Sequence, residues 1–507
     1  MKKVLLFLGL CLYLFTLNAQ TPNPPTDRQL IENTIQLYFD GWATGDTNKL
    51  GKAMHITCHL KNFRDGKFID IPRLDYLSRF KPRERDKNLT THIVYVDITD
   101  NKIAGAKVEI NTATLKFTDY FNLMKTSEGW FIVDKISTNA PFKTLVANVP
   151  KPEKEVILEG LKRPWSIAFL SEENVLITEK EGDLLSINLT TKVKTPIKGF
   201  PADIVDSIGA YHFGDNSGIF EVLLDPNFSQ NKSVYISYAT ENQEGKTTKV
   251  IRGKLENNEL QQVQTLLLAT HYSADRYHYG GGMVFGQDGK LYITIGERLF
   301  TEKDEPEIPI AQDVRDTRGK IYCINPDGSI PQGNPDFGEN AVAGLYAIGI
   351  RAAQGLTVEP MSKKIWFSEH GTIQGDEINV LNPRANYGWP IKTTGKYRFE
   401  GYNPRKTKDS VYTEPIWSWS HTVAPTGLTF YTGDEFPLWK NSLLVAGLSK
   451  GSLWRMTVEG ETVKSAEELF IDSRVRARKI VQSPMGKLYI LTDDKNGLLV
   501  RIKNNVK

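Results

Sequence analysis

Residues 281–298 read GGMVFGQDGKLYITIGER. Two short apolar runs, 283–285 and 291–295, flank the polar turn GQDGK. Neither run has helical spacing, and the turn between them contains two glycines and an aspartate, which is typical of two antiparallel strands joined by a tight turn. The stretch therefore predicts the first two strands of a small antiparallel sheet.

The same order of strand, polar turn and strand recurs along the chain. The other copies are WSIAFLSEENVLITEKEGDLLSIN (165–188), GIFEVLLDPNFSQNKSVYISYA (218–239), QGLTVEPMSKKIWFSEHG (354–371), TGLTFYTGDEFPLWKNSLLVAG (426–447) and ARKIVQSPMGKLYILTDD (477–494). Copies at intervals of roughly fifty to seventy residues indicate small sheets arranged radially. We therefore expect residues 156–507 to form an all-β, six-bladed propeller whose loops build a site at one mouth.

One loop of this region combines carboxylates with an irregular backbone. Residues 368–390 read SEHGTIQGDEINVLNPRANYGWP and follow an apolar strand at 364–368. Such a loop can present hard oxygen ligands from backbone carbonyls and from Asp376 and Glu377. The alternative is that both carboxylates are solvated turn residues.

The composition limits the class of protein. Lys and Arg total 63 against 60 Asp and Glu in 507 residues, without long charged runs, which argues against a nucleic-acid partner. At the N-terminus Lys2 and Lys3 precede an apolar run at 4–17, so we expect residues 1–20 to be a secretory signal and the protein to be periplasmic or secreted. No second apolar stretch is long enough to span a membrane.

The cysteines support no disulfide framework. Cys11 lies within the expected signal, and Cys58 and Cys323 fall in different predicted domains. The stability of both domains must therefore come from packed cores.

The region from 27 to 146 differs from the repeats and predicts an α+β domain. Helical spacing from Ile31 to Trp42 ends at Gly45-Asp46, a second helix follows, and alternating segments predict strands. These strands are expected at 92–98, 103–110, 114–125 and 129–136. Residues 147–155, ANVPKPEKE, read as an exposed linker.

The motifs YFDGWATGD (38–46) and GWFIVDKIS (129–137) resemble the SnoaL-like, lumazine-binding-like cone family. That resemblance implies a cone that encloses a pocket, which His55, His59 and Asp119 could line. The alternative places these polar residues on strand and helix faces. We expect the domain to bind a small ligand or to pack on the propeller.

The region from about 155 to the C-terminus resembles the soluble quinoprotein aldose dehydrogenases, the glucose/sorbosone dehydrogenase family. The motifs that carry this resemblance are HYGGGMVFGQDGKLYITIGER, GKIYCINPDGSIPQGNP, RAAQGLTVEP, SEHGTIQGDEINVLNPRANYGWP and TVAPTGLTFYTGDEFPLWKNSLLV. The resemblance implies the cofactors pyrroloquinoline quinone (PQQ) and calcium, a sugar substrate, and a quinone or cytochrome as electron acceptor.

The resemblance also implies roles for single residues. His278 matches the base that takes the proton of the anomeric hydroxyl, and imidazole suits this task near neutral pH. The residues that match cofactor contacts are Asn216, Arg351, Thr422, Lys450, Arg476 and Arg478. Strand alternation would place Arg476 and Arg478 on one face, as two guanidinium groups that converge on an anion require.

For calcium, the resemblance assigns the carbonyls of Gly371 and Thr372 beside the cofactor. Glu377 and Tyr387 match further calcium-associated positions in the same loop. Oxygen ligands of these kinds are those that calcium prefers.

Several positions depart from the family pattern. Asn216 replaces a glutamine, Ala352-Ala353 replace Asn-Pro, Thr372 replaces a proline, and Gly282 replaces an arginine. The cofactor-site lysine of some members falls at Ser449, one residue before Lys450. These changes bear on cofactor binding more than on the fold.

Three functions therefore stay open. The first is PQQ- and calcium-dependent oxidation of an aldose. The second is an exported propeller that binds carbohydrate or protein without turnover, with a decayed cofactor site. The third is a calcium-dependent lactonase, which the arginine pair argues against because a neutral lactone does not need several fixed cations.

Overall fold

The computed structural model describes residues 25–64, 66–86, 89–141, 151–205, 215–404, 411–449 and 453–505. Two compact units divide at residues 149 and 150. The expected signal (1–20) and residues 147–150 of the expected linker lie outside the described residues. Residues 152–155, also predicted as linker, instead begin a strand, β7 (Pro152–Leu161). None of the described helices is long and apolar enough to cross a membrane.

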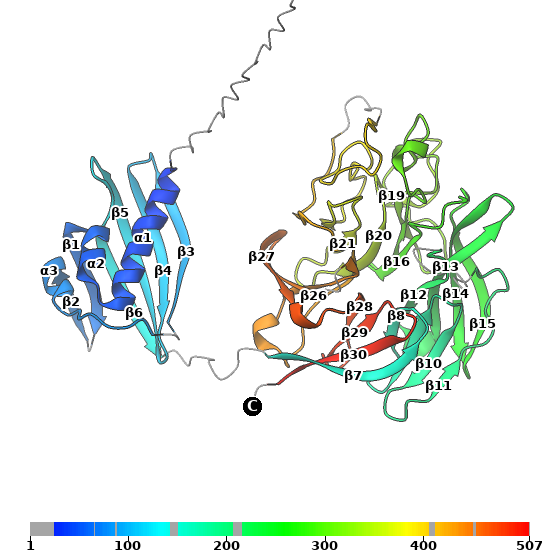
Figure 1. Cartoon of the computed structure of the whole chain (residues 1–507), viewed down its shortest axis with the longest axis horizontal. Helices are drawn as coiled ribbons and strands as arrows, with labels where there is room; N and C mark the ends of the chain where they lie inside the picture. The colour runs from blue at the N-terminus through cyan, green and yellow to red at the C-terminus, as the bar shows by residue number, and fades with distance from the viewer. Residues whose placement is uncertain are drawn as a thin grey trace, which may run out of the picture. The chain divides into compact units, whose positions relative to one another are not determined.

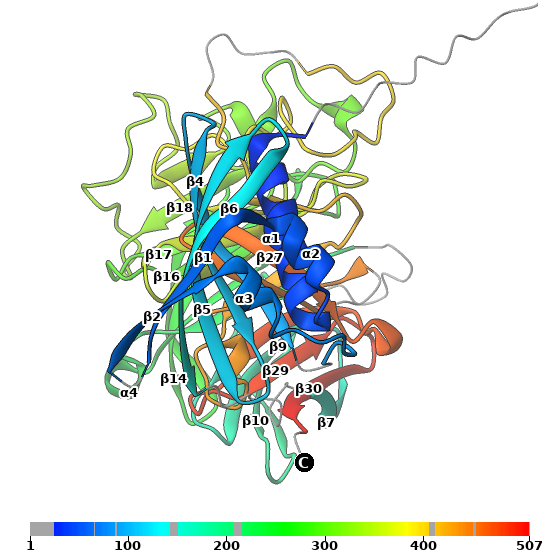
Figure 2. The same ribbon diagram turned by 90° about the vertical axis from the view of Figure 1, so that its left-hand side faces the viewer.

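The first unit is a curved sheet with helices on one face (Figure 2). Its six strands follow the order β2-β1-β6-β5-β4-β3, and all neighbours are antiparallel except β1 and β6. The elements are α1 (Asp27–Thr44), α2 (Thr47–Ala53), β1 (Met54–Arg64), β2 (Lys67–Pro72), α3 (Arg73–Leu77), β3 (Thr90–Thr99), β4 (Ile103–Asn111), β5 (Leu115–Thr126) and β6 (Gly129–Pro141).

The sequence determines where α1 begins and ends. The Thr26 side chain accepts a hydrogen bond from the backbone of Gln29, whose side chain bonds back to Thr26, and Gly45 ends the helix with φ 69°. The apolar face of α1, including Ile31, Ile35 and Tyr38, packs with alternate residues of β4 and β5 in one buried core. The four strands predicted from the sequence are confirmed, whereas β1 and β2 were not predicted.

The second unit contains six four-stranded antiparallel sheets among its described residues, in chain order (Figure 1). Five sheets are β8–β11, β12–β15, β16–β19, β20–β23 and β24–β27, and the sixth pairs β28–β30 with β7 from the start of the unit. The first strand of each sheet contacts the first strand of the next, and β28 contacts β8. The first strands therefore form a closed ring.

The strands of this unit have the following bounds: β7 (Pro152–Leu161), β8 (Pro164–Phe169), β9 (Asn174–Glu179), β10 (Leu184–Asn188), β11 (Lys194–Pro196), β12 (Ile219–Leu224), β13 (Ser233–Asn242), β14 (Gly245–Glu256), β15 (Glu259–Leu268), β16 (Gly280–Phe285), β17 (Leu291–Ile295), β18 (Lys320–Ile324), β19 (Leu345–Ile348), β20 (Ala353–Val358), β21 (Ile365–Glu369), β22 (Glu377–Val380), β23 (Trp417–Ser418), β24 (Pro425–Phe430), β25 (Leu443–Gly447), β26 (Leu453–Glu459), β27 (Thr462–Leu469), β28 (Ala477–Gln482), β29 (Leu488–Thr492) and β30 (Gly497–Asn504). The one α-helix described here, α4, spans Phe228–Asn231.

Buried hydroxyl groups join neighbouring sheets. Thr178 on β9 donates to the carbonyl of Phe220 on β12 (2.6 Å), and Thr294 on β17 donates to that of Ala353 on β20 (3.0 Å). Ser237 and Ser368 repeat the contact at two further junctions. The repeated small hydroxyl residue of the second strand thus satisfies a carbonyl of the next sheet.

Each sheet also has a bulge at the start of its first strand, where the register against the second strand shifts. An extra residue in one strand re-aims its side chain. Trp165, Phe220, Gln354 and Arg478 lie within four of these bulges and line the same cavity. The bulges therefore carry side chains from separate sheets into one site.

Candidate active site

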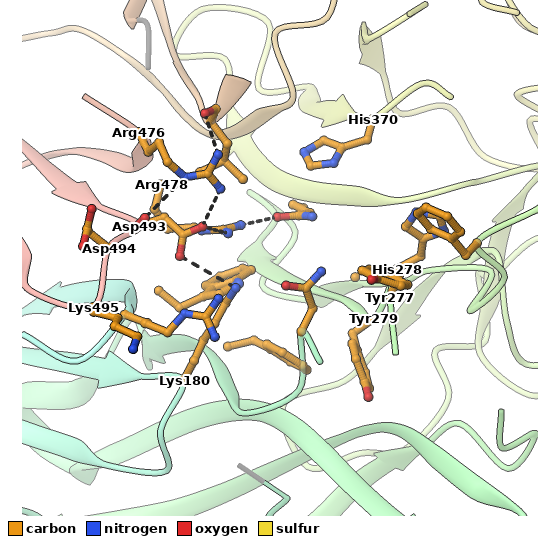
Figure 3. A pocket seen from close by; sticks show the side chains of 18 of the residues that line it. Lys180, Tyr277, His278, Tyr279, His370, Arg476, Arg478, Asp493, Asp494 and Lys495 are labelled. Carbon is orange, nitrogen blue, oxygen red and sulfur yellow. Dashed lines mark hydrogen bonds and ion pairs between the residues drawn. The ribbon is translucent and has the colours of Figure 1, made fainter. Parts of the chain in front are cut away.

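A cavity of about 590 Å³ lies among the first strands and the loops that follow the second strands (Figure 3). Trp165, Phe220, Tyr277, Tyr279 and Phe300 contribute aromatic surface. Six basic residues line the cavity against two carboxylates, Asp493 and Asp494. The basic residues are Arg163, Lys180, Arg398, Arg476, Arg478 and Lys495.

His278 lies at one side of this cavity (Figure 3) and is held by two charged neighbours. Its Nδ1 lies 2.9 Å from Oε1 of Glu297, and its Nε2 lies 3.3 Å from a terminal nitrogen of Arg351. The His278 backbone has φ 54°, and its carbonyl lies where a Cβ on Gly296 would come within 2.0 Å. Only glycine at 296 permits this approach.

Burial and charge set the protonation of this pair. Burial, together with the positive charges of Arg351 and Arg398, lowers the pKa of His278 well below its ordinary value. Burial also raises the pKa of Glu297, whose Oε2 accepts a hydrogen bond from the Trp389 indole N–H. The two groups thus share one proton at Nδ1, and the lone pair of the neutral imidazole is at Nε2, where Arg351 donates to it.

The other side of the cavity is organised around Asp493, which is 8% exposed. Arg476 and Arg478 both donate to its Oδ2, at 3.1 and 2.7 Å, and Nζ of Lys180 lies 3.8 Å from Oδ1. These cations hold the pKa of Asp493 far below its usual range. The two arginines therefore converge on an anion as predicted, and this anion is the carboxylate of Asp493.

The prediction that strand alternation places Arg476 and Arg478 on one face is wrong. Arg476 precedes β28, and a bulge separates Ala477 from Lys479, so the two arginines are not alternate residues of one regular strand. The Arg478 side chain is 5% exposed and that of Arg476 is 53% exposed.

Lys180 is a buried amine in this group. Burial lowers its pKa to about 7, although Asp493 opposes the shift. A ligand with negative charge would favour the ammonium form.

The predicted calcium positions behave differently from one another. Arg351 donates to the carbonyl of Gly371, and Arg398 donates to that of Thr372 at 3.1 Å. The Tyr387 hydroxyl donates to the carbonyl of Val380 at 2.6 Å, so it is not directed to a metal. Among the described residues, no group of three His, Cys, Asp or Glu side chains is arranged to hold a metal ion.

Glu377 and Tyr387 nevertheless line a separate cavity of about 20 Å³ with Glu369 and Gly371. Such a volume holds about one water-sized particle. Burial and the charge of Glu377 raise the pKa of Glu369 to about 8, and burial raises that of Glu377. A cation between the two carboxylates would stabilise both, so these residues fit calcium if backbone oxygens complete the coordination.

The remaining predicted residues are scattered. Asn216 lines the large cavity. Thr422 lies outside its lining, and its hydroxyl donates to the carbonyl of Ile373. Lys450 falls outside the described residues. At Gly282 an added Cβ would lie 2.3 Å from the Gln354 carbonyl, so no side chain fits there.

Sequence reasoning missed Glu297, Asp493, Lys180, His370 and Arg398. Four sheets have an acid at the end of their second strand or directly after it. These acids are Glu179 in TEK, Glu297 in GER, Glu369 in SEH and Asp493 in TDD. This recurring acid, buried in all four copies, was an available signal. Arg398 had no comparable signal because it lies in an irregular loop.

The cone unit has a cavity of about 350 Å³. Asp119 and Lys135 form a buried ion pair there at 2.7 Å. His55 and His59 lie outside its lining and bond to Thr57 and Asp70. Of the three predicted candidates, only Asp119 lines this cavity.

The second unit matches a known family over nearly all of its length. The model of the family described as glucose / sorbosone dehydrogenase matches residues 161–501. The chain belongs to the glucose/sorbosone dehydrogenase family. This membership confirms the resemblance drawn from the sequence, and a model described as putative lumazine-binding matches residues 26–137 of the cone unit.

Relatives within the glucose/sorbosone dehydrogenase family cover the same region. The aldose sugar dehydrogenase YliI of Escherichia coli is 30% identical over 74% of this chain and 98% of its own length. The quinoprotein glucose dehydrogenase B of Acinetobacter calcoaceticus is 28% identical over 67% and 85%.

Solved structures agree on the fold of the second unit. The apo-form of the soluble aldose sugar dehydrogenase of Escherichia coli superposes with a TM-score of 0.64 at 30% identity, covering 70% of this chain and all of that one. The PQQ-bound aldose sugar dehydrogenase of Streptomyces coelicolor has a TM-score of 0.55 at 24% identity, covering 70% of this chain and all of that one.

Proposed function

We propose that this chain oxidises an aldose to its lactone with PQQ as the hydride acceptor and His278 as the base. The observation that carries the proposal is the placement of the His278–Glu297 pair across one cavity from the Arg476–Arg478–Asp493 group. The relatives named as aldose sugar and glucose dehydrogenases support a sugar substrate.

The residues of the cavity fit PQQ, which is a planar tricarboxylate. Basic groups exceed acidic ones by six to two, and five aromatic residues can border a flat ring system. Nε of Arg478 and Nε2 of His370 are buried without a hydrogen-bond partner in the described chain. Such groups call for a polar ligand.

His278, Glu297 and Arg351 have separate roles in the proton transfer. When the sugar's anomeric hydroxyl takes the place of the Arg351 donor at Nε2, the neutral His278 takes its proton, and Glu297 at Nδ1 stabilises the imidazolium that forms. Arg351, stacked at 5.1 Å from the Trp389 ring, keeps the imidazole facing the cavity. PQQ, when bound, supplies the two-electron acceptor for the C1 hydride.

We make four further proposals, on the fold, the export signal, a metal ion and the electron acceptor. The closed ring of first strands supports a six-bladed β-propeller. Residues 1–20 have the composition of a signal for export to the periplasm or medium. Glu369, Glu377 and backbone oxygens around Gly371 and Tyr387 are proposed to hold a calcium ion, and electrons would pass on to a quinone or cytochrome.

The test is a titration of the full-length protein with PQQ in calcium buffer, followed by a panel of aldoses. We expect saturable binding at micromolar PQQ, and bleaching of the oxidised quinone by at least one aldose. His278→Ala should bind PQQ without bleaching, and the exposed His421→Ala should behave as the wild type. Absence of PQQ binding would contradict the proposal and favour a binding propeller without turnover.

A further inference from the structure

The six basic residues that line the large cavity form two groups. Five lie around Asp493 and Asp494, across the cavity from His278 (Figure 3), and they are Arg163, Lys180, Arg476, Arg478 and Lys495. The sixth, Arg398, comes from another loop and contacts Phe300. The two groups can therefore serve different ligands.

The charge of the first group suits the cofactor by itself. With Lys180 in its ammonium form, five positive charges face two carboxylates, which leaves an excess of three. PQQ carries three carboxylates, so this group can neutralise the cofactor without Arg398. Since the cofactor's charge is then balanced, a second anion can enter the cavity and bind Arg398 without strong repulsion.

Arg398 is held next to the base. Its guanidinium lies 4.3 Å from the centre of the Phe300 ring, and the centre of this ring lies 6.4 Å from that of His278. The buried Glu302 accepts hydrogen bonds from the backbone N–H of Arg398 (3.1 Å) and of Phe399 (3.2 Å), which fixes this part of the loop. A ligand that binds Arg398 therefore lies beside the base.

The Arg398 guanidinium is available to such a ligand. The residue is exposed, and its two terminal nitrogens donate to the carbonyls of Thr372 (3.1 Å) and Phe300 (3.5 Å). In the described parts of the chain it forms no ion pair, and the two carboxylates whose charges act on it, Glu302 and Glu297, accept hydrogen bonds from other groups. Guanidinium has five N–H donors, so donors remain for an anion.

We propose that the substrate is an aldose that carries a carboxylate, of the uronic acid class, with its carboxylate at Arg398 and its anomeric hydroxyl at His278. The inference rests on the proposed function. A guanidinium can bind a carboxylate through two parallel hydrogen bonds, which orients the sugar as well as holding it. One carboxylate also matches the single charge of Arg398, whereas a phosphate would bring up to about two negative charges.

Such a substrate would also help the base. The positive charge of Arg398 contributes to the lowered pKa of His278. A carboxylate bound at Arg398 offsets this charge, so the imidazole accepts a proton more readily in the complex than in the free protein.

The test uses full-length, PQQ-loaded protein in calcium buffer and sugars that differ only at C6: glucose against glucuronate and glucose 6-phosphate, and galactose against galacturonate. We expect kcat/KM to be about tenfold or more higher for at least one uronate than for its neutral partner, since a charge-assisted pair is gained. Arg398→Gln should remove this advantage, and Arg398→Lys should keep part of it. The exposed Arg315→Gln, whose native side chain pairs with Asp313, should match the wild type.

The outcomes separate this inference from the proposed function. Equal or higher kcat/KM for the neutral sugars, a preference for the phosphate alone, or a uronate preference that Arg398→Gln retains overturns the inference while the dehydrogenase proposal stands. If none of these sugars reduces the bound PQQ, both fail. A PQQ titration of Arg398→Gln should give the wild-type dissociation constant, and a tenfold loss there would assign Arg398 to the cofactor instead. Circular dichroism and a thermal melt of each variant establish that it is folded.

Discussion

Nδ1 of His278 lies 2.9 Å from Oε1 of Glu297, and the two side chains are 10% and 2% exposed. A buried carboxylate in this position fixes the tautomer of the imidazole and favours its protonated form during proton transfer. The pair comes from two points of one sheet, His278 before β16 and Glu297 after β17. The antiparallel pairing of β16 with β17 therefore brings the base His278 and its partner Glu297 together.

Glu297→Gln should lower kcat by about 10²- to 10⁴-fold, because the imidazolium loses its compensating charge. The dissociation constant for PQQ should change little, since Glu297 faces the histidine. Steady-state kinetics and a PQQ titration of the same preparation measure both quantities. Glu339→Gln, at an exposed position, is the control.

The pH dependence follows from the lowered pKa of His278. The base is active when unprotonated, so kcat/KM should be level from neutral pH down to the ordinary imidazole value near 6.5. It should fall only at lower pH, as the lowered pKa is crossed. A descending limb with its midpoint above 6.5 would contradict this assignment.

Lys180 should make PQQ binding pH-dependent. Its pKa is about 7 in the free protein, and a polyanion raises it by favouring the ammonium form, so binding takes up protons near neutral pH. Affinity should therefore be highest below pH 7 and should fall as the pH rises above it. Calorimetry in two buffers of different ionisation enthalpy measures the proton uptake, which Lys180→Met should largely remove.

Asp493→Asn should destabilise the second unit by about 3–5 kcal/mol, because Arg478 is left buried without its carboxylate partner. The pKa of Asp493 is lowered on folding, so the native stabilisation is present above pH 4 and is lost only as the pH falls below that value. Denaturant unfolding at pH 7 measures the loss. Asp494→Asn, a substitution at the exposed neighbouring position, should lower the free energy of unfolding much less.

The buried pair of Asp119 and Lys135 gives a prediction for the cone unit. Asp119→Asn removes one partner and should destabilise the unit, whereas the double variant Asp119→Leu with Lys135→Met should recover much of the loss. Hydrogen exchange of the β5 and β6 amides in the full chain reports on this unit. Equal protection in the single variant and the wild type would show that the pair contributes little.

Much of the fold follows from periodic sequence. The strand–turn–strand copies and the alternating segments of the cone match observed strands, because apolar periodicity decides which face of a strand is buried. Strands β1 and β2 were not predicted. Exposed apolar residues such as Ile56, Phe63 and Phe68 obscure their alternation.

The candidate site was less predictable, because it is built from departures from regular structure. A bulge turns Arg478 into the cavity, and no alternation rule anticipates that shift. His278 was a candidate from its imidazole and the glycines that follow it, and the family resemblance assigned it the role of base. That Glu297 is its partner required the three-dimensional pairing of β16 with β17. The contacts of Arg398 depend on a loop whose path the sequence does not encode in a simple pattern.

The most direct test of the dehydrogenase proposal is a single-turnover reaction of PQQ-loaded protein with an aldose, without oxygen or another acceptor. The loss of the oxidised-quinone absorbance is followed with ordinary sugar and with sugar deuterated at C1. We expect one equivalent of lactone per cofactor, a slower reaction with the deuterated sugar, and little reaction in His278→Ala. A cofactor that binds and stays oxidised with every aldose would contradict it.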